Sequence, residues 1–144
     1  MGLDCYIVHG NDRSKDFTSE DEPRIKDVSL CGGIMSGHGA DGSFRGKWYE
    51  PLIDELLETD YLWHIEGEDA HITAQQLKEQ AEALADLLHS VESDAKHLEQ
   101  TLEPETIVYQ TRRMEAEYTY QEIQDLELLL RCASERGAVM VCWW

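Results

Sequence analysis

The sequence predicts an α+β domain in which three or four helices pack on a small sheet formed largely by the N- and C-terminal strands. Two capping-box patterns each open an amphipathic segment, which predicts helices. Short apolar segments rich in β-branched and aromatic residues stand at both ends of the chain, which predicts strands. The length of 144 residues favours a single domain, 1–144, that is large enough to bury a core.

The N-terminal part of the chain predicts one strand and a long loop. Residues 3–8, Leu-Asp-Cys-Tyr-Ile-Val, are predicted to form a short strand. Residues 11–27 are polar and charged with Pro23 near the middle, so we expect a mobile surface loop there. Residues 28–31 are predicted as a second, brief strand.

A glycine-rich loop is predicted over residues 31–47. Six of the ten glycines of the chain lie between residues 31 and 46, a density that regular elements do not tolerate. The loop leads into a segment whose apolar residues recur with the i, i+3, i+4 spacing of a helix, up to Glu58. Proline fits in the first turn of a helix, and Pro51 therefore predicts a helix start near Glu50.

The middle of the chain predicts a long helix. Residues 73–76, Thr-Ala-Gln-Gln, form a capping box, and an apolar stripe follows it to about Val91. Residues 89–102 extend this helix with weaker periodicity. Glu103-Pro104-Glu105 then interrupts it.

The last third of the chain predicts a helix and a strand. Residues 106–117 stay open between strand and helix, because short apolar runs do not settle the choice. The capping box of residues 119–122 predicts a helix that ends at Arg136, before Gly137. Residues 138–144 are predicted as a strand that pairs with the N-terminal one, which would cover much of its apolar edge.

The negative charge is concentrated in the acidic helical region of residues 48–105. The chain has a formal net charge of −18, and this region contains 16 acidic and 2 basic side chains, whereas residues 1–47 and 106–144 each have a net charge of −2. Acidic residues three and four positions apart share one face of a helix. The predicted acidic partner face consists of Glu79, Glu82 and Asp86.

Composition excludes several classes of function. The net charge argues against direct nucleic-acid binding and against binding to anionic membranes. The sequence contains no apolar run near the ~20 residues of a membrane helix. The N-terminus shows no basic segment followed by an apolar stretch, so we expect a cytoplasmic protein.

The glycine-rich loop has the chemistry of an anion site. Glycine-rich backbone and a following helix N-terminus both offer N–H groups to an anion, and Arg45 and Lys47 add two cations. The G-x-G-x-x-G pattern at residues 37–42 lacks a βαβ context, and a structural loop packed on the core is the alternative. The candidate ligand-binding residues are Ser36, His38, Asp41, Ser43, Arg45, Lys47 and Trp48.

Cysteine and histidine give weaker signals. The four cysteines are far apart and form no CxxC motif, so reduced thiols are the expectation. Cys5, His9, Cys31 and His38 have spacings that are not typical of structural zinc, and we predict no metal site and no cofactor. A nucleophilic pair of Cys31 and His38 is a further alternative.

Three segments carry a resemblance to other proteins. These are the opening Met-Gly-Leu-Asp-Cys-Tyr of residues 1–6, the Gly-Ser-Phe-Arg-Gly-Lys of residues 42–47, and residues 135–144 with their final Trp-Trp. They are similar to a set of small hypothetical proteins from bacteria and their phages that open with Met-Gly-Leu-Asp-x-Tyr. The resemblance covers the ends and the loop, and it implies no activity or catalytic residues. A link to phages favours an inhibitor or a sequestering protein.

The sequence leads to a functional expectation and its alternatives. We expect a non-enzymatic cytoplasmic binding protein whose loop 31–47 binds a small anionic, nucleotide-like ligand or an acidic group of a partner. The alternative is an acidic inhibitor that imitates nucleic acid and blocks a basic cleft of a partner protein through residues 48–105. A weaker alternative is a hydrolase that uses Cys31 or His38. The apolar ends of the chain leave a homodimer open.

Overall fold

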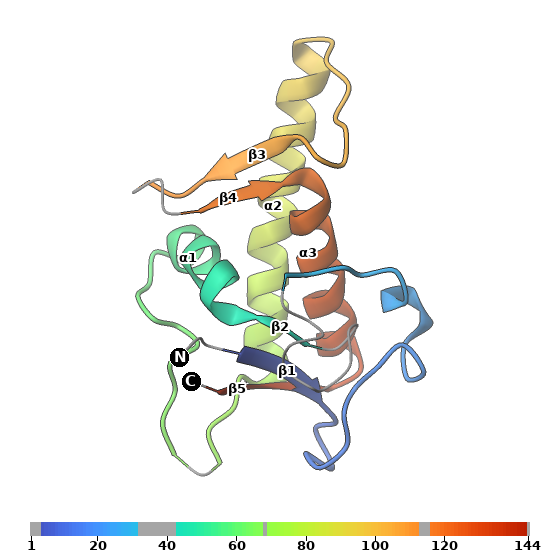
Figure 1. Ribbon diagram of the computed structural model, residues 1–144, viewed down its shortest axis with the longest axis vertical. Coiled ribbons are helices and arrows are strands. Elements are labelled where there is room, and N and C mark those ends of the chain that lie inside the picture. The colour runs from blue at the N-terminus through green and yellow to red at the C-terminus, as the bar shows by residue number, and fades with distance from the viewer. Residues whose placement is uncertain (1–3, 32–42, 68, 113–115, 144) are drawn as a thin grey trace.

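The α+β class is confirmed by the computed structural model, which describes residues 4–31, 43–67, 69–112 and 116–143. A small sheet lies at one end of the molecule, and the long helix α2 runs away from it beside α3 (Figure 1). In chain order the elements are β1 (Asp4–Val8), the 3₁₀ helix η1 (Pro23–Ile25), β2 (Ser43–Arg45), α1 (Gly46–Leu57), α2 (Ala74–His97), β3 (Ile107–Gln110), β4 (Glu117–Thr119), α3 (Tyr120–Glu135) and β5 (Val139–Trp143).

The two ends of the chain meet in an antiparallel sheet with the strand order β2-β1-β5. β1 pairs with β5 along its whole length, from Asp4 opposite Trp143 to Val8 opposite Val139. The predicted pairing of the terminal strands is therefore confirmed. β2 covers the other edge of β1 and leads directly into α1.

The second strand lies elsewhere than predicted. β2 falls within the predicted glycine-rich loop, whereas residues 28–31 form no strand. The N–H of Ser29 donates to a carboxylate of α3 at 3.1 Å, and the N–H of Cys31 donates to the Tyr49 hydroxyl at 2.9 Å. These donors go to side chains of helices, so they are not offered to a neighbouring strand.

Both predicted capping boxes are present. Thr73 accepts a bond from the N–H of Gln76 at 3.2 Å, and the Gln76 side chain accepts one from the N–H of Thr73 at 2.8 Å. Thr119 and Glu122 make the same exchange at the start of α3. α2 runs to His97, so it includes much of the extension that the sequence indicated.

α1 begins one turn earlier than predicted. It starts at Gly46, and Pro51 is its sixth residue. A proline inside a helix loses the hydrogen bond to the residue four positions earlier. Here that residue is Lys47, which is exposed, so water can donate a hydrogen bond to the carbonyl that Pro51 leaves unbonded.

The segment that the sequence left open forms a hairpin of β3 and β4. Figure 1 shows this hairpin above α1, with the C-terminal end of α2 beyond it. Tyr118 of β4 is fully buried, and its ring lies 5.8 Å from that of Trp48 and 6.5 Å from that of Tyr109. Burial of this aromatic side chain favours the strand, which places it against the core.

The core lies between the sheet, α1 and the facing sides of α2 and α3. The segment predicted as a surface loop also contributes Phe17 and Ile25 to it. No helix of the described residues is long and apolar enough to cross a membrane. Fully buried side chains include Phe44, Tyr49, Leu52, Ile53, Trp63, Leu77, Leu84, Ile123, Leu126, Leu129 and Leu130.

Candidate functional site

The base of the glycine-rich loop is closed by backbone and hydroxyl bonds. The N–H of Arg45 donates to the carbonyl of Cys31 at 2.7 Å, and the N–H of Cys31 donates to the Tyr49 hydroxyl at 2.9 Å. The two ends of the loop therefore lie side by side at the start of α1. Ser36, His38 and Asp41, which the sequence places in this site, lie outside the described residues.

The described loop residues gather around the N-terminus of α1. Ser43 is buried in β2, Arg45 is half-buried at the N-cap, and Lys47 is exposed in the first turn. Trp48 is 36% exposed, and its indole N–H donates to Glu122 at 3.2 Å. The Trp48 ring is thus anchored to α3, and only part of it is open to a ligand.

Glu122 of α3 connects this region to the core. The Tyr49 hydroxyl donates to Glu122 at 2.9 Å while it accepts the bond from Cys31. Burial raises the pKa of Tyr49 well above its usual range, and the negative charge of Glu122 adds to the rise. The hydroxyl therefore stays protonated and remains a donor to Glu122 at physiological pH.

The charges at both ends of α1 oppose its dipole. Acidic side chains usually lie near a helix N-terminus and basic ones near its C-terminus. The first turn of α1 contains Lys47 and no acidic residue, and Arg45 makes no side-chain capping bond. The last turn contains no basic residue, and Glu58 ends the helix with a φ of 54°. Two basic residues therefore stand at the N-terminus of α1 and acidic residues at its C-terminus.

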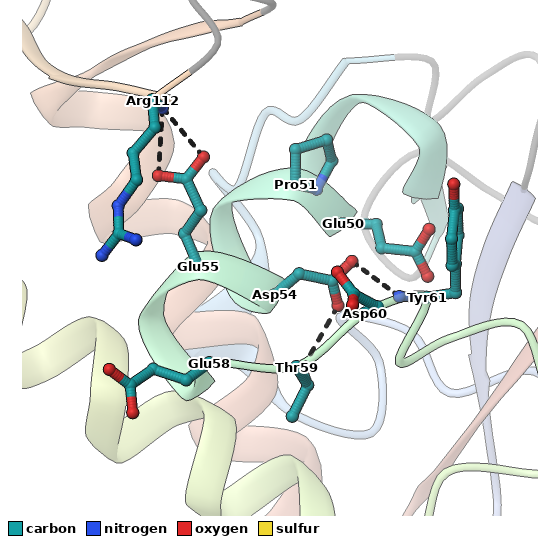
Figure 2. Close-up of a pocket in the computed structure, with 9 residues that line it drawn as sticks. All are labelled: Glu50, Pro51, Asp54, Glu55, Glu58, Thr59, Asp60, Tyr61 and Arg112. Carbon is teal, nitrogen blue, oxygen red and sulfur yellow. Dashed lines mark hydrogen bonds between the residues drawn. The ribbon is translucent and has the colours of Figure 1, made fainter.

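An acidic pocket of about 450 Å³ opens at the C-terminal end of α1 (Figure 2). Five of its lining residues are acidic and one is basic. A volume of this size is within the usual range for small-molecule sites. The lining residues are Glu50, Pro51, Asp54, Glu55, Glu58, Thr59, Asp60, Tyr61 and Arg112.

Two of the pocket carboxylates hold the segment that follows α1. Asp54 accepts bonds from the N–H groups of residues 61 and 62 at 2.9 and 3.1 Å. Glu50 is buried and accepts bonds from the N–H of Trp63 at 2.8 Å and from Nδ1 of His64 at 2.9 Å. Burial raises the pKa of both carboxyl groups, although these bonds oppose the rise.

Glu55 is held by the β3–β4 hairpin. The backbone N–H of Arg112 donates to both oxygens of Glu55 at 3.0 and 3.2 Å, and the Tyr109 hydroxyl donates to one of them at 3.0 Å. Burial and the nearby Glu55 raise the pKa of Tyr109 to about 12. Figure 2 shows the Arg112 guanidinium extended away from the Glu55 carboxylate. The arginine thus binds Glu55 through its backbone.

Apart from Glu50, which lies 2.9 Å from Nδ1 of His64, the pocket carboxylates make no ion pair among the residues that the structure describes. The donors to Asp54 and Glu55 are neutral N–H and hydroxyl groups, which orient a carboxylate without cancelling its charge. Glu58 and Asp60 are exposed at the rim, and neither makes an ion pair with any described residue. This arrangement can bind a cationic group.

The predicted acidic partner face lies on the solvent side of α2. Glu79, Glu82 and Asp86 are all exposed, opposite the buried stripe that contains Leu77 and Leu84. Within the described part of the chain none of the three makes an ion pair. The three residues thus share one exposed face of α2, and the role of this face in binding a partner stays a prediction.

The predicted cysteine and histidine sets are not brought together in the described residues. His9 bonds Asp21 at 3.1 Å, and the thiol of Cys5 lies against that of Cys142. Cys31 is exposed, and its candidate partner His38 lies outside the described residues. No group of histidine, cysteine, aspartate and glutamate in the described ranges is arranged to hold a metal ion.

The acidic pocket was not predicted as a site, although its signal is present in the sequence. Glu50, Asp54, Glu55 and Glu58 recur at helical spacing along α1 with no basic residue between them. That pattern places several carboxylates toward one side of the helix. The contribution of Arg112 could not be found in this way, because the hairpin that carries it was left open.

No family model, curated protein or solved structure matches the chain.

Proposed function

We propose that this protein is a non-enzymatic cytoplasmic binding protein that binds a positively charged segment of a partner protein. It does so through the acidic residues of the pocket at the C-terminal end of α1 and of the exposed face of α2, which all lie within residues 48–105. The observation that carries the proposal is the pocket at the C-terminal end of α1. There five acidic residues, the negative end of a helix dipole and one arginine line the same pocket. If the partner uses the same basic segment to bind nucleic acid, this protein acts as its inhibitor.

The geometry of the pocket supports binding because the carboxylates are already oriented. Asp54 and Glu55 are held by two or more hydrogen bonds each, so they lose little rotamer freedom when a cation arrives. Glu58 and Asp60 at the rim supply charge that steers a basic segment toward the pocket. Acids at a helix C-terminus disfavour the folded state, and such local conflicts concentrate at functional sites.

The acidic face of α2 extends the proposed surface. Its residues Glu79 to Asp86 span about 10 Å along the helix axis, at about 1.5 Å per residue. Three charges over this length are less dense than the phosphates of one DNA strand, which are about 3.4 Å apart along the axis. The α2 face therefore supports an accessory contact better than a full imitation of nucleic acid.

The test measures binding of a fluorescent arginine octapeptide by anisotropy at about 50 mM and about 200 mM salt. The variant E58Q/D60N removes two rim charges that make no described ion pair. We expect its affinity to fall roughly tenfold at the lower salt, since each exposed charge contributes up to about 1 kcal/mol. The variant E79Q/E82Q/D86N should show a smaller loss.

A matched control separates the pocket from general acidity. E103Q/E105Q removes two exposed charges outside the pocket and the α2 face, with the same change in net charge as E58Q/D60N. Equal losses in these two variants would show binding to net charge alone and would contradict the proposal. Unchanged binding of the peptide by E58Q/D60N would contradict it as well.

A second candidate function is anion binding at the glycine-rich loop. It is favoured by the N-terminus of α1, which lacks a side-chain cap and has Arg45 and Lys47 beside it, whereas α2 and α3 both begin with capping boxes. Calorimetry with ATP as a nucleotide-like probe tests it. Binding that R45A abolishes, while R13A binds normally, would support the site, and equal binding by R45A would place it elsewhere.

A further inference from the structure

The first and last strands carry two cysteines directly opposite each other. In the antiparallel pairing of β1 and β5, Cys5 faces Cys142, and the two Sγ atoms are 3.2 Å apart. Opposed residues in antiparallel strands have Cα atoms about 4.5 to 5.5 Å apart. Disulfides form at Cα separations of about 4.4 to 6.8 Å, so the backbone already meets this requirement. Both cysteines are free thiols in this structure.

We propose that Cys5 and Cys142 form a redox-responsive pair, which a low-molecular-weight disulfide such as oxidised glutathione converts into an intramolecular disulfide that joins β1 to β5. The pair lies within the sheet, on the central strand β1 and the edge strand β5.

The two thiols differ in access, which sets the order of reaction. Cys5 is completely buried, whereas Cys142 is half-buried near the end of β5. The reagent therefore reaches Cys142 first. Of the two other cysteines, Cys132 is fully buried in α3 and Cys31 is exposed at the base of the loop. Cys31 is therefore an internal control: the reagent can reach it, but among the described residues no other thiol faces it.

The chemistry balances with oxidised glutathione as the only co-reactant. The Cys142 thiol loses its proton and attacks one glutathione sulfur, the glutathione S–S bond breaks, and the first reduced glutathione leaves with that proton. Cys5 then loses its proton and attacks the Cys142 sulfur. The mixed disulfide breaks and the second reduced glutathione leaves. The two protein sulfurs are oxidised and one glutathione disulfide is reduced.

Burial and the neighbouring Cys142 raise the pKa of Cys5 well above its usual range. Burial therefore lowers the fraction of Cys5 present as thiolate at neutral pH, and this slows the second step because the thiolate is the attacking species. The second step is intramolecular, and the two sulfurs are already close together, so both features favour its rate.

The bond would change the stability of the whole chain. Cys5 and Cys142 are 137 positions apart, so the disulfide closes almost the entire chain into one loop. A cross-link over such a long loop removes much of the conformational freedom of the unfolded chain. It also fixes β5, the edge strand, to the centre of the sheet. Oxidation is therefore expected to raise the denaturant concentration at the midpoint of unfolding.

The test treats the reduced full chain with oxidised glutathione, then counts thiols under denaturing conditions and maps peptides by mass spectrometry. We expect a peptide pair linked through Cys5 and Cys142, a lower thiol count and a higher urea midpoint. C31S should show the same link and the same rise in midpoint. C142S should show neither, and circular dichroism is used to check that this variant is folded.

Several results would overturn the proposal. One is a wild-type protein that carries glutathione on Cys31 and keeps both Cys5 and Cys142 reduced. Another is a link that joins Cys142 to Cys31 or to a second chain. A rise in midpoint that C142S also shows would place the effect elsewhere. If C142S does not fold, C5A in the same assay serves as the second variant.

Discussion

Replacing Tyr49 by phenylalanine removes one hydroxyl from the base of the glycine-rich loop and leaves the ring in place. This hydroxyl accepts a bond from the N–H of Cys31 and donates one to Glu122, both at 2.9 Å. Tyr49 is fully buried, and its ring contacts those of Phe44 and Tyr118. The Y49F variant thus tests whether these two bonds tie the loop to α1 and α3.

The expected loss of stability follows from the two hydrogen-bond partners of the Tyr49 hydroxyl, Glu122 and Cys31. A bond to a charged group such as the Glu122 carboxylate contributes about 1.5 to 3 kcal/mol, and Glu122 keeps its bond from Trp48 in the variant. The bond from Cys31 contributes about 1 kcal/mol or less, because Cys31 is exposed and water can replace the hydroxyl. The free energy of unfolding should fall by about 2 to 3 kcal/mol, which lowers Tm by about 10 °C in a chain of this length.

Urea unfolding followed by circular dichroism measures this loss, and hydrogen exchange reports the amide of Cys31. We expect exchange at the Cys31 amide to accelerate in Y49F by more than exchange in the centre of β1, which follows the global stability. Y61F is the matched control, since Tyr61 is 71% exposed and should change stability by less than about 0.5 kcal/mol. A Y49F variant as stable as Y61F, with the Cys31 amide equally protected, would refute the reasoning.

Two further predictions concern acidic residues and pH. Arg24 and Arg136 bond the buried Glu22 at 3.0 Å, and these contacts lower the pKa of Glu22 to about 2. This stabilisation is complete above the glutamate pKa of about 4.3 in the unfolded chain, and it disappears as pH falls toward 2. The urea midpoint of E22Q should therefore be lower than that of the wild type at pH 7. Below about pH 4 the midpoint of E22Q should depend less on pH than that of the wild type. Glu50 has the opposite sign, because burial raises its pKa and the folded state then holds its proton more tightly. The contribution of Glu50 should grow as pH falls from neutral toward the ordinary glutamate pKa of about 4.3, so the midpoint should change more in the wild type than in E50Q. An equal change in both would contradict this assignment. Urea titrations at a series of pH values, with E58Q as the exposed control, measure both effects.

The local features of this fold are determined by the sequence. The capping boxes at Thr73 and Thr119 work through residues three positions apart, so the start of each helix follows from neighbouring side chains. Gly137 adopts a φ of 69° after α3, as its place behind Arg136 predicts. The apolar terminal segments could be recognised as strands for the same reason, because their pattern is confined to a few residues.

The candidate sites follow the sequence only in part. Arg45 and Lys47 stand next to the start of α1 because they are adjacent in the chain. The acidic face of Glu79, Glu82 and Asp86 follows from helical spacing. Helical spacing does not by itself predict the complete pocket. Asp60 reaches the pocket only because the segment after it folds back and bonds Glu50 and Asp54.

The tertiary structure decided the features that depend on contacts between residues far apart in the sequence. β2 forms at Ser43–Arg45 because β1 offers it an edge, whereas the N–H groups of Ser29 and Cys31 donate to side chains of α3 and α1. The hairpin of β3 and β4 is favoured because it buries Tyr118. Cys5 meets Cys142 only through the register of strands 137 positions apart. Short-range hydrogen bonds and periodicity can be read from neighbouring residues, but the burial and pairing of distant ones are settled only when the whole chain packs.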